Sequence, residues 1–189
     1  DAKRPDYVFF PDQTSRREAE KASDRAAFRE SALALGEVKR WDAPLGKKPW
    51  AGGTGFEDQN PSWQIGQLLS TAGVDWGLLS NGRLWRLVHR DTAARLDTYY
   101  EIDLVAMMER GDPEALLYFT LFFRQAAFLA DDQGRVFLEE LLERINDQLD
   151  GNWWAFNCAA GGDFVSGGMG RPFGHAIAMT ANIAAWQRL

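Results

Sequence analysis

Residues 33–41 carry the stretch on which the expected fold depends. They read Leu33-Ala34-Leu35-Gly36-Glu37-Val38-Lys39-Arg40-Trp41. The run is short and apolar enough for a β-strand, and successive side chains of a strand point to opposite faces. Because Glu37 and Lys39 are two residues apart, we expect them to share one face. A carboxylate and an ammonium group would then lie side by side at the end of this strand.

A second strand-like segment comes earlier in the chain. Residues 7–10 are apolar and end at Pro11-Asp12, a turn signal, and Asp6 stands at their start. If the two strands pair, Asp6 converges with Glu37 and Lys39. Two close carboxylates attract a hard divalent cation such as Mg²⁺, and a lysine beside them can orient an attacking water or offset charge on a phosphate. The group indicates phosphodiester hydrolysis, and the alternative is a solvated strand face beside an ordinary turn.

Length and composition limit the class of protein. The chain has 189 residues, of which 46% are hydrophobic and 13% aromatic, as in one globular domain with a good core. No apolar stretch reaches the length of a membrane span. Cys158 is the single cysteine, so no internal disulfide forms and a reducing, cytoplasmic setting is expected. The two histidines, His89 and His175, are far apart in sequence, which argues against a zinc site.

Charge is distributed unevenly along the chain. The net charge is −6, yet residues 1–50 contain 11 basic and 9 acidic residues, whereas residues 101–150 contain 4 basic and 12 acidic ones. Arg40, Lys47 and Lys48 follow the Glu-x-Lys strand, where a DNA backbone would lie. A solvated loop is the alternative for this cluster. The weak basicity indicates that other domains supply most of the DNA affinity.

The order of elements that the sequence predicts is that of an α/β protein. Asn81-Gly82 between two apolar runs is a strong hairpin signal. Trp76 and Trp85 are expected to pack in the sheet rather than stack on bases. The predicted elements are a helix over 14–31, a long mobile loop over 43–61, a helix over 62–72, hairpin strands over 74–80 and 83–88, a strand over 98–102, and helices over 112–130 and 135–149.

A longer string in the middle of the chain resembles the amino-terminal nuclease region of restriction-modification enzymes. It reads Asn60-Pro61-Ser62-Trp63-Gln64-Ile65 and, further on, Gly73-Val74-Asp75-Trp76-Gly77-Leu78-Leu79-Ser80-Asn81-Gly82-Arg83-Leu84-Trp85-Arg86-Leu87. The string is similar to that of fused type II enzymes, in which a nuclease precedes an adenine methyltransferase, and more distantly to type I restriction subunits. These proteins belong to the PD-(D/E)xK nuclease superfamily, and the resemblance covers roughly residues 4–128.

The resemblance implies a fold and a division of the chain. The expected fold is an α/β restriction-endonuclease-like core, with a central mixed sheet flanked by helices and additional C-terminal helices. The core would occupy residues 1–102 and the helical extension residues 103–150. Residues 151–189 form a Gly- and Trp-rich tail of unassigned structure.

The resemblance also implies roles for individual residues. Asp6 and Glu37 would be metal ligands, joined by the backbone carbonyl of Val38, and Lys39 would be the catalytic lysine. Gln64 would lie near the metal and the scissile phosphate, although the bare sequence favours an amide on the surface of a helix. The implied cofactor is Mg²⁺, with Mn²⁺ as a substitute. The implied partners are double-stranded DNA and, in the same polypeptide or complex, adenine methyltransferase and target-recognition domains.

Two departures from the family pattern leave a second reading open. Relatives tend to carry tyrosine where this chain has Leu68, and an upstream helix that often adds a glutamate is expected before Asp6 but is missing. A catalytically inactive domain of the same fold, acting in DNA binding or protein interaction, is therefore the alternative. In the latter case the acidic residues 101–150 would dock a basic partner.

Overall fold

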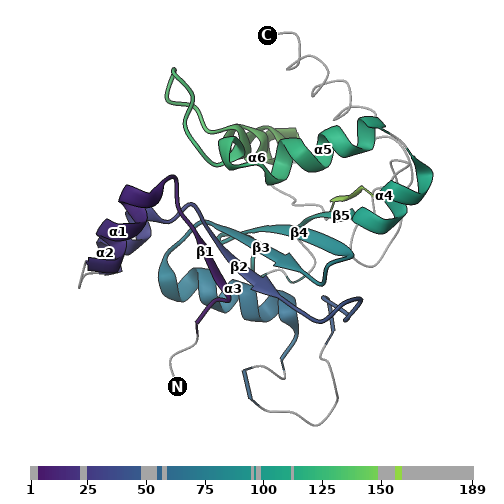
Figure 1. The fold of residues 1–189 in the computed structure, drawn as a ribbon, viewed down its shortest axis with the longest axis horizontal. Helices are drawn as coiled ribbons and strands as arrows, with labels where there is room; N and C mark the ends of the chain where they lie inside the picture. Colours follow the sequence, from purple (N-terminus) through teal and green to yellow (C-terminus); the bar gives the residue numbers. More distant parts are fainter. Residues whose placement is uncertain are drawn as a thin grey trace.

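A computed structural model gives the structure of the chain and describes residues 4–21, 25–47, 55–56, 59–94, 96, 99–111, 113–148 and 156–158. Its centre is a mixed β-sheet, so the predicted α/β architecture is confirmed. Figure 1 shows α3 on one face of this sheet and α5 and α6 on the other. Among the described residues, no helix has both the length and the apolar character needed to cross a membrane.

The strands lie in the sheet in chain order, from β1 at one edge to β6 at the other. The β2–β3 and β5–β6 pairs are parallel and the other neighbouring pairs are antiparallel. The strands are β1 (Tyr7–Phe9), β2 (Ala34–Val38), β3 (Trp76–Ser80), β4 (Leu84–His89), β5 (Tyr100–Asp103) and β6 (Phe156–Cys158). The helices are α1 (Gln13–Lys21), α2 (Arg25–Ser31), α3 (Pro61–Ala72), α4 (Leu104–Arg110), α5 (Pro113–Phe123) and α6 (Phe137–Gln148), with a 3₁₀-helix η1 (Gln125–Ala127).

Helix α3 is the crossover between the parallel strands β2 and β3. Asn60 caps its start by accepting a hydrogen bond from the Ser62 N–H, and Pro61 occupies the first turn, where a missing N–H costs nothing. Gly73 ends the helix in the left-handed region, at φ +74. Because a crossover helix runs back along the sheet, the first turn of α3 lies at the edge where β2 and β3 end. We call this side of the sheet, which the carboxyl ends of β2 and β3 form, the carboxyl edge.

The predicted hairpin is confirmed in β3 and β4, which pair antiparallel around Asn81-Gly82. The buried Asn81 amide oxygen accepts from the N–H groups of Arg83 and Leu84, at 3.1 and 2.7 Å. Its amide nitrogen donates to the carbonyl of Ala43, at 2.7 Å. Asn81 therefore shapes the turn and also fixes the segment that follows β2.

Two different cores lie on the two faces of the sheet. The alternation of side chains sends Leu35 to the α3 face and Ala34 to the α5/α6 face. The α3 face is mainly aliphatic and consists of Leu35, Leu45, Ile65, Leu68, Leu69, Val74, Leu79, Val88 and Ala93. The opposite face is richer in aromatic rings, and its buried members are Ala34, Trp76, Leu87, Phe122, Ala127 and Leu138.

The boundaries of two predicted helices are wrong. The helix expected over 14–31 is two helices, α1 and α2, on either side of residues 22–24, which lie outside the described residues. The helix expected over 112–130 ends at Phe123, because Arg124 has extended backbone, with ψ 151. A turn then follows, in which the Asp131 carboxylate accepts from two backbone N–H groups and Gly134 takes φ +78.

The two hairpin tryptophans pack as predicted. Trp76 is 8% exposed and belongs to the core of the α5/α6 face. The ring of Trp85 makes edge-on contacts with Phe119 and Phe123 of α5. Both indoles therefore hold helices onto the sheet.

Candidate active site

Asp6 and Glu37 meet across the first two strands. The antiparallel register pairs Tyr7 with Gly36 and Val8 with Leu35, so continuing it by one residue sets Asp6 opposite Glu37. The Asp6 carboxylate is exposed and accepts a hydrogen bond from the Val38 N–H at 2.8 Å. This bond fixes the carboxylate beside the last residue of β2, at the carboxyl edge.

Glu37 and Lys39 are in direct contact. Lys39 Nζ donates to Glu37 Oε1 at 2.6 Å, and the two side chains are 15% and 4% exposed. The two residues therefore share a face. A carboxylate this deeply buried needs a cation or several hydrogen bonds to offset its desolvation, and the lysine is one such partner. Asp6, Glu37 and Lys39 thus gather at one end of β2, on the side where α3 begins.

Gln64 is fully buried, so the interpretation as a surface amide is wrong. Its nitrogen Nε2 donates to the carbonyls of Phe56 and Gln59, at 2.6 and 3.1 Å. A flipped amide would set an oxygen against both carbonyls, so these bonds fix the orientation. Gln64 Oε1 is consequently a buried acceptor that no described donor satisfies. Such an atom is costly unless it meets a donor, and a metal-bound water is one.

The residues fit a hard divalent cation in part. Carboxylate oxygens of Asp6 and Glu37 are the ligand type that Mg²⁺ prefers, and Mg²⁺ keeps several waters. Val38, whose carbonyl the resemblance adds as a ligand, lies between Glu37 and Lys39 at the end of β2. No group of three or more His, Cys, Asp or Glu side chains gathers within the described ranges. A cation here would complete its shell with backbone carbonyl, water and phosphate oxygens.

Leu68 lies in the aliphatic core of the α3 face and is 3% exposed. It is one helical turn from Gln64 and supplies no hydroxyl at the position where the family pattern of the resemblance has tyrosine.

Of the three basic residues in the predicted DNA-binding cluster, the structure describes two, Arg40 and Lys47. Arg40 and Lys47 are exposed, and neither forms an ion pair with any residue that the structure describes. Lys48 lies outside the described residues. The backbone between Arg40 and Lys47 is anchored, because the Leu45 carbonyl accepts from the N–H and the hydroxyl of Ser62, at 3.2 and 3.0 Å. The two described cations thus stand on a segment held to the start of α3.

A buried ion pair that the sequence analysis does not predict lies near the site. Arg86 Nε donates to the Glu101 carboxylate, and both side chains are at most 7% exposed. The guanidinium also donates to Ser62 Oγ at 2.9 Å and lies 3.8 Å from the ring centre of Tyr99. The sequence does indicate that Arg86 is buried. Leu84, Arg86 and Val88 are two residues apart on one strand, so their side chains share the face that packs against the core.

The sheet register connects this pair with the candidate site. Glu37 stands beside Leu79 on β3, and Leu79 stands beside Arg86 on β4. Glu101 stands beside Arg86 on β5. A row of side chains therefore crosses the α3 face from Glu37 to Glu101, with one leucine between the two buried ion pairs.

No family model, curated protein or solved structure matches this chain. The α/β architecture therefore rests on the structure itself.

Proposed function

We propose that the chain is the Mg²⁺-dependent DNA endonuclease domain of a restriction-modification or phage-defence enzyme that acts in the cytoplasm. The observation that carries the proposal is the strand register that sets Asp6 opposite Glu37, with the Asp6 carboxylate bound to the Val38 N–H and Lys39 Nζ 2.6 Å from Glu37 Oε1. Two carboxylates and a lysine at one strand end would supply oxygen ligands for a hard cation and an ammonium group that can face a phosphate.

The side chains would divide the chemistry of phosphodiester hydrolysis. Asp6 and Glu37, with the Val38 carbonyl, would hold Mg²⁺ or Mn²⁺, which when bound polarises the phosphate and acidifies water. Lys39 orients the attacking water and offsets charge on the phosphoryl oxygens. The water oxygen bonds to phosphorus in line while one of its protons passes to solvent, the bond from phosphorus to the 3′ oxygen breaks, and that oxygen takes up a proton from solvent. By analogy with the family, the products carry 5′-phosphate and 3′-hydroxyl ends.

Substrate binding follows from the charges beside the site. Arg40, Lys47 and Lys48 are proposed to contact the phosphate backbone of double-stranded DNA. Their small number supports a division of labour in which target-recognition and adenine methyltransferase domains, in the same polypeptide or complex, select the sequence.

A catalytically inactive domain that binds DNA or a protein is the second candidate. Two observations favour it: Lys39 already engages a Glu37 oxygen, and Leu68 cannot supply a hydroxyl. This candidate retains the fold and the basic loop but predicts no strand cleavage with either metal.

A plasmid nicking assay with Mg²⁺ or Mn²⁺ separates the two candidates. We expect wild type to nick and Lys39→Ala to be about 100- to 1000-fold slower, the loss typical of removing one preorganised charge-stabilising group. Lys21→Ala is the matched control, because Lys21 is an exposed lysine at the end of α1. Asp6→Asn is a second test variant, since Asp6 is exposed and its replacement leaves the core intact.

Thermal melting of each variant shows whether a lost activity reflects a lost fold. Removing Lys39 leaves the Glu37 carboxylate buried with less compensation, so that variant alone is expected to melt earlier. Wild-type protein that never nicks, or Asp6→Asn protein that nicks at the wild-type rate, would contradict the proposed endonuclease.

A further inference from the structure

Trp41 is an exposed indole beside the candidate active site. It is 68% exposed, whereas a tryptophan in a folded domain usually hides most of its large apolar surface. The sequence places it two residues after Lys39 and four after Glu37. Four residues of chain span at most about 14 Å, so the ring lies within reach of nucleotides next to a phosphate held at Glu37.

The ring rests on the turn of the β3–β4 hairpin. A Cβ atom added to Gly82 would lie 2.7 Å from Trp41 Cε3 and 3.0 Å from Cζ3, so the indole packs directly on glycine backbone. Gly82 itself has φ +85, a conformation that other residues rarely take. The hairpin therefore supports one side of the ring at a position where only glycine leaves room.

The backbone after Trp41 is strained and fixed. Asp42 has φ +55, in the left-handed region that costs a non-glycine residue free energy. Its N–H donates to the Asn81 carbonyl at 3.2 Å, and its carboxylate lies 3.5 Å from Arg83 Nη1. Strain of this kind persists only where surrounding contacts impose it, and here those contacts come from the hairpin that supports the indole.

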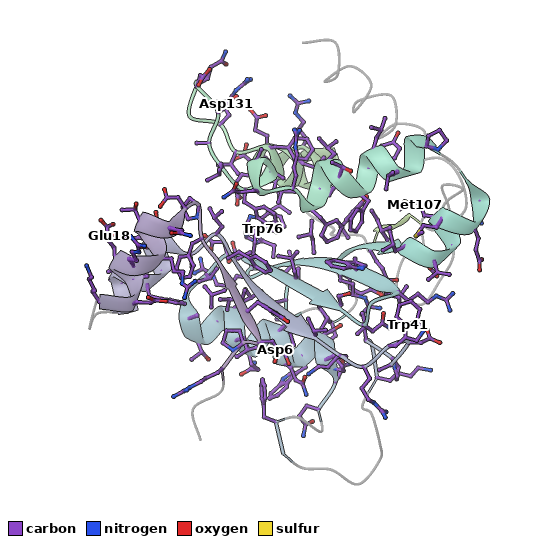
Figure 2. The ribbon with its side chains drawn as sticks, in the orientation of Figure 1. Asp6, Glu18, Trp41, Trp76, Met107 and Asp131 are labelled. Carbon is purple, nitrogen blue, oxygen red and sulfur yellow. The ribbon has the colours of Figure 1, made fainter. Side chains whose placement is uncertain are left out.

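Exposed cations stand on the same segment of the chain as Trp41. Arg40 precedes it in the chain and Lys47 ends the same anchored segment, both exposed and without an ion pair to any described residue. Figure 2 shows Trp41 and Asp6 along the same edge of the sheet. Proteins bind single-stranded nucleic acid with exposed aromatic faces on which bases stack and with nearby cations that meet the phosphates, and this segment carries both kinds of side chain.

We propose that Trp41 is a stacking platform for an unpaired base of the DNA strand held at the site. The inference rests on the proposed function and narrows its substrate class, because the bases of a closed duplex present no free π-face. The bound strand is therefore already single-stranded at the nucleotide next to the phosphate that is cut, and a closed blunt duplex offers no base to the ring.

Binding in EDTA tests the stacking without any cleavage step. The probes are a short labelled single-stranded oligonucleotide and the blunt duplex of the same sequence, with full-length chain. Trp41→Ala should weaken single-strand binding roughly tenfold, as for other base-stacking aromatics, and change duplex binding less than about twofold. Trp41→Phe keeps a ring and should stay within about threefold of wild type. Met108→Ala, at an equally exposed residue of α4 (69%), is the control and should bind as wild type does.

Three outcomes would overturn the inference: single-strand binding that survives Trp41→Ala unchanged, equal losses on single strand and duplex, and no binding of either probe by wild type. Melting curves show whether the alanine variant is folded, and the phenylalanine variant keeps the test decisive if it is not. Failure of the proposed function is a separate result, because it is read from plasmid nicking, whereas stacking is read from metal-free binding.

Discussion

The two faces of the sheet differ in what they bury: the α3 face holds ion pairs among aliphatic side chains, and the α5/α6 face holds aromatic rings. The α3 face buries charged side chains among aliphatic ones, with Glu37 bound to Lys39 and Arg86 bound to Glu101. The face under α5 and α6 buries rings, as in the stacked pair of Tyr100 and Phe122, whose centroids are 4.0 Å apart. Apolar burial stabilises a fold directly, whereas a buried ion pair at best offsets its own desolvation. The contrast indicates that the α3 face gives up some stability to hold charges in place.

On the aromatic face, a polar side-chain contact joins Trp76 of the sheet to Glu139 of α6. Trp76 Nε1, on the aromatic face, donates to Glu139 Oε1 of α6 at 2.6 Å, and the carboxylate sits at the margin of the core. Here the charged side chain holds α6 to β3 by one hydrogen bond. On the α3 face the Lys39–Glu37 contact stays within one segment, whereas Arg86 of β4 joins Glu101 of β5 and Ser62 of α3. The charges of this face are therefore buried with their partners and not left at the margin of the core.

Breaking the Arg86–Glu101 pair should have the largest effect on stability. Arg86→Met removes the guanidinium from a carboxylate that is 5% exposed, and we expect a loss of about 4 kcal/mol in the free energy of unfolding, measured by urea denaturation. Replacing both members, as Arg86→Met with Glu101→Leu, should recover most of this loss because no buried charge is left alone. A single variant as stable as wild type would show that water reaches Glu101 and that the face is not as dry as described.

The equivalent break on the aromatic face should cost less. Trp76→Phe keeps a ring in the core but removes the N–H that Glu139 accepts, and we expect a loss of about 1.5 kcal/mol, the size of a hydrogen bond to a charged group. Glu139→Gln retains an acceptor and serves as the matched control, with a smaller loss. If Trp76→Phe were as damaging as Arg86→Met, the proposed difference between the two faces would be contradicted.

The sequence predicted the parts of this molecule that depend on local patterns. The hairpin followed from Asn81-Gly82, and the packing of Trp76 followed from its position inside an apolar strand. Helix ends were harder. Phe123 ends α5 because the next residue adopts extended backbone, and nothing in the apolar run announces that change.

The candidate site was only partly visible before the structure. Strand alternation is local, so the contact of Glu37 with Lys39 could be expected, and pairing with Asp6 needed only two strands to meet. The Arg86–Glu101 pair was not predicted, because strand parity places Arg86 on the core face but does not identify a partner fifteen residues later on another strand. Trp41 gave no sequence signal, since exposure of an indole depends on which surfaces the fold leaves open.

Asp103 provides the finest test of the comparison, because it shares the strand face of Glu101 but sits at the rim, where β5 leads into α4. Burial alone raises the pKa of Asp103, but the hydrogen bond from Arg83, the Ala106 N–H and the charge of Arg83 outweigh it and hold the pKa below its usual value. A lowered folded-state pKa means that the contribution of Asp103 to stability is present above the unfolded pKa of about 3.9 and is lost as pH falls through the folded value.

Asp103→Asn keeps the helix cap and loses the charge. We expect this variant to be about 0.5 kcal/mol less stable than wild type near neutral pH. The effect is small because the partner Arg83 is 42% exposed, so solvent and salt screen the pair. Urea midpoints measured from neutral pH into acid should show the two proteins converging below about pH 4. A difference that stays constant with pH would show that Asp103 acts through its shape, as the buried residues of the aromatic face do, and not through its charge.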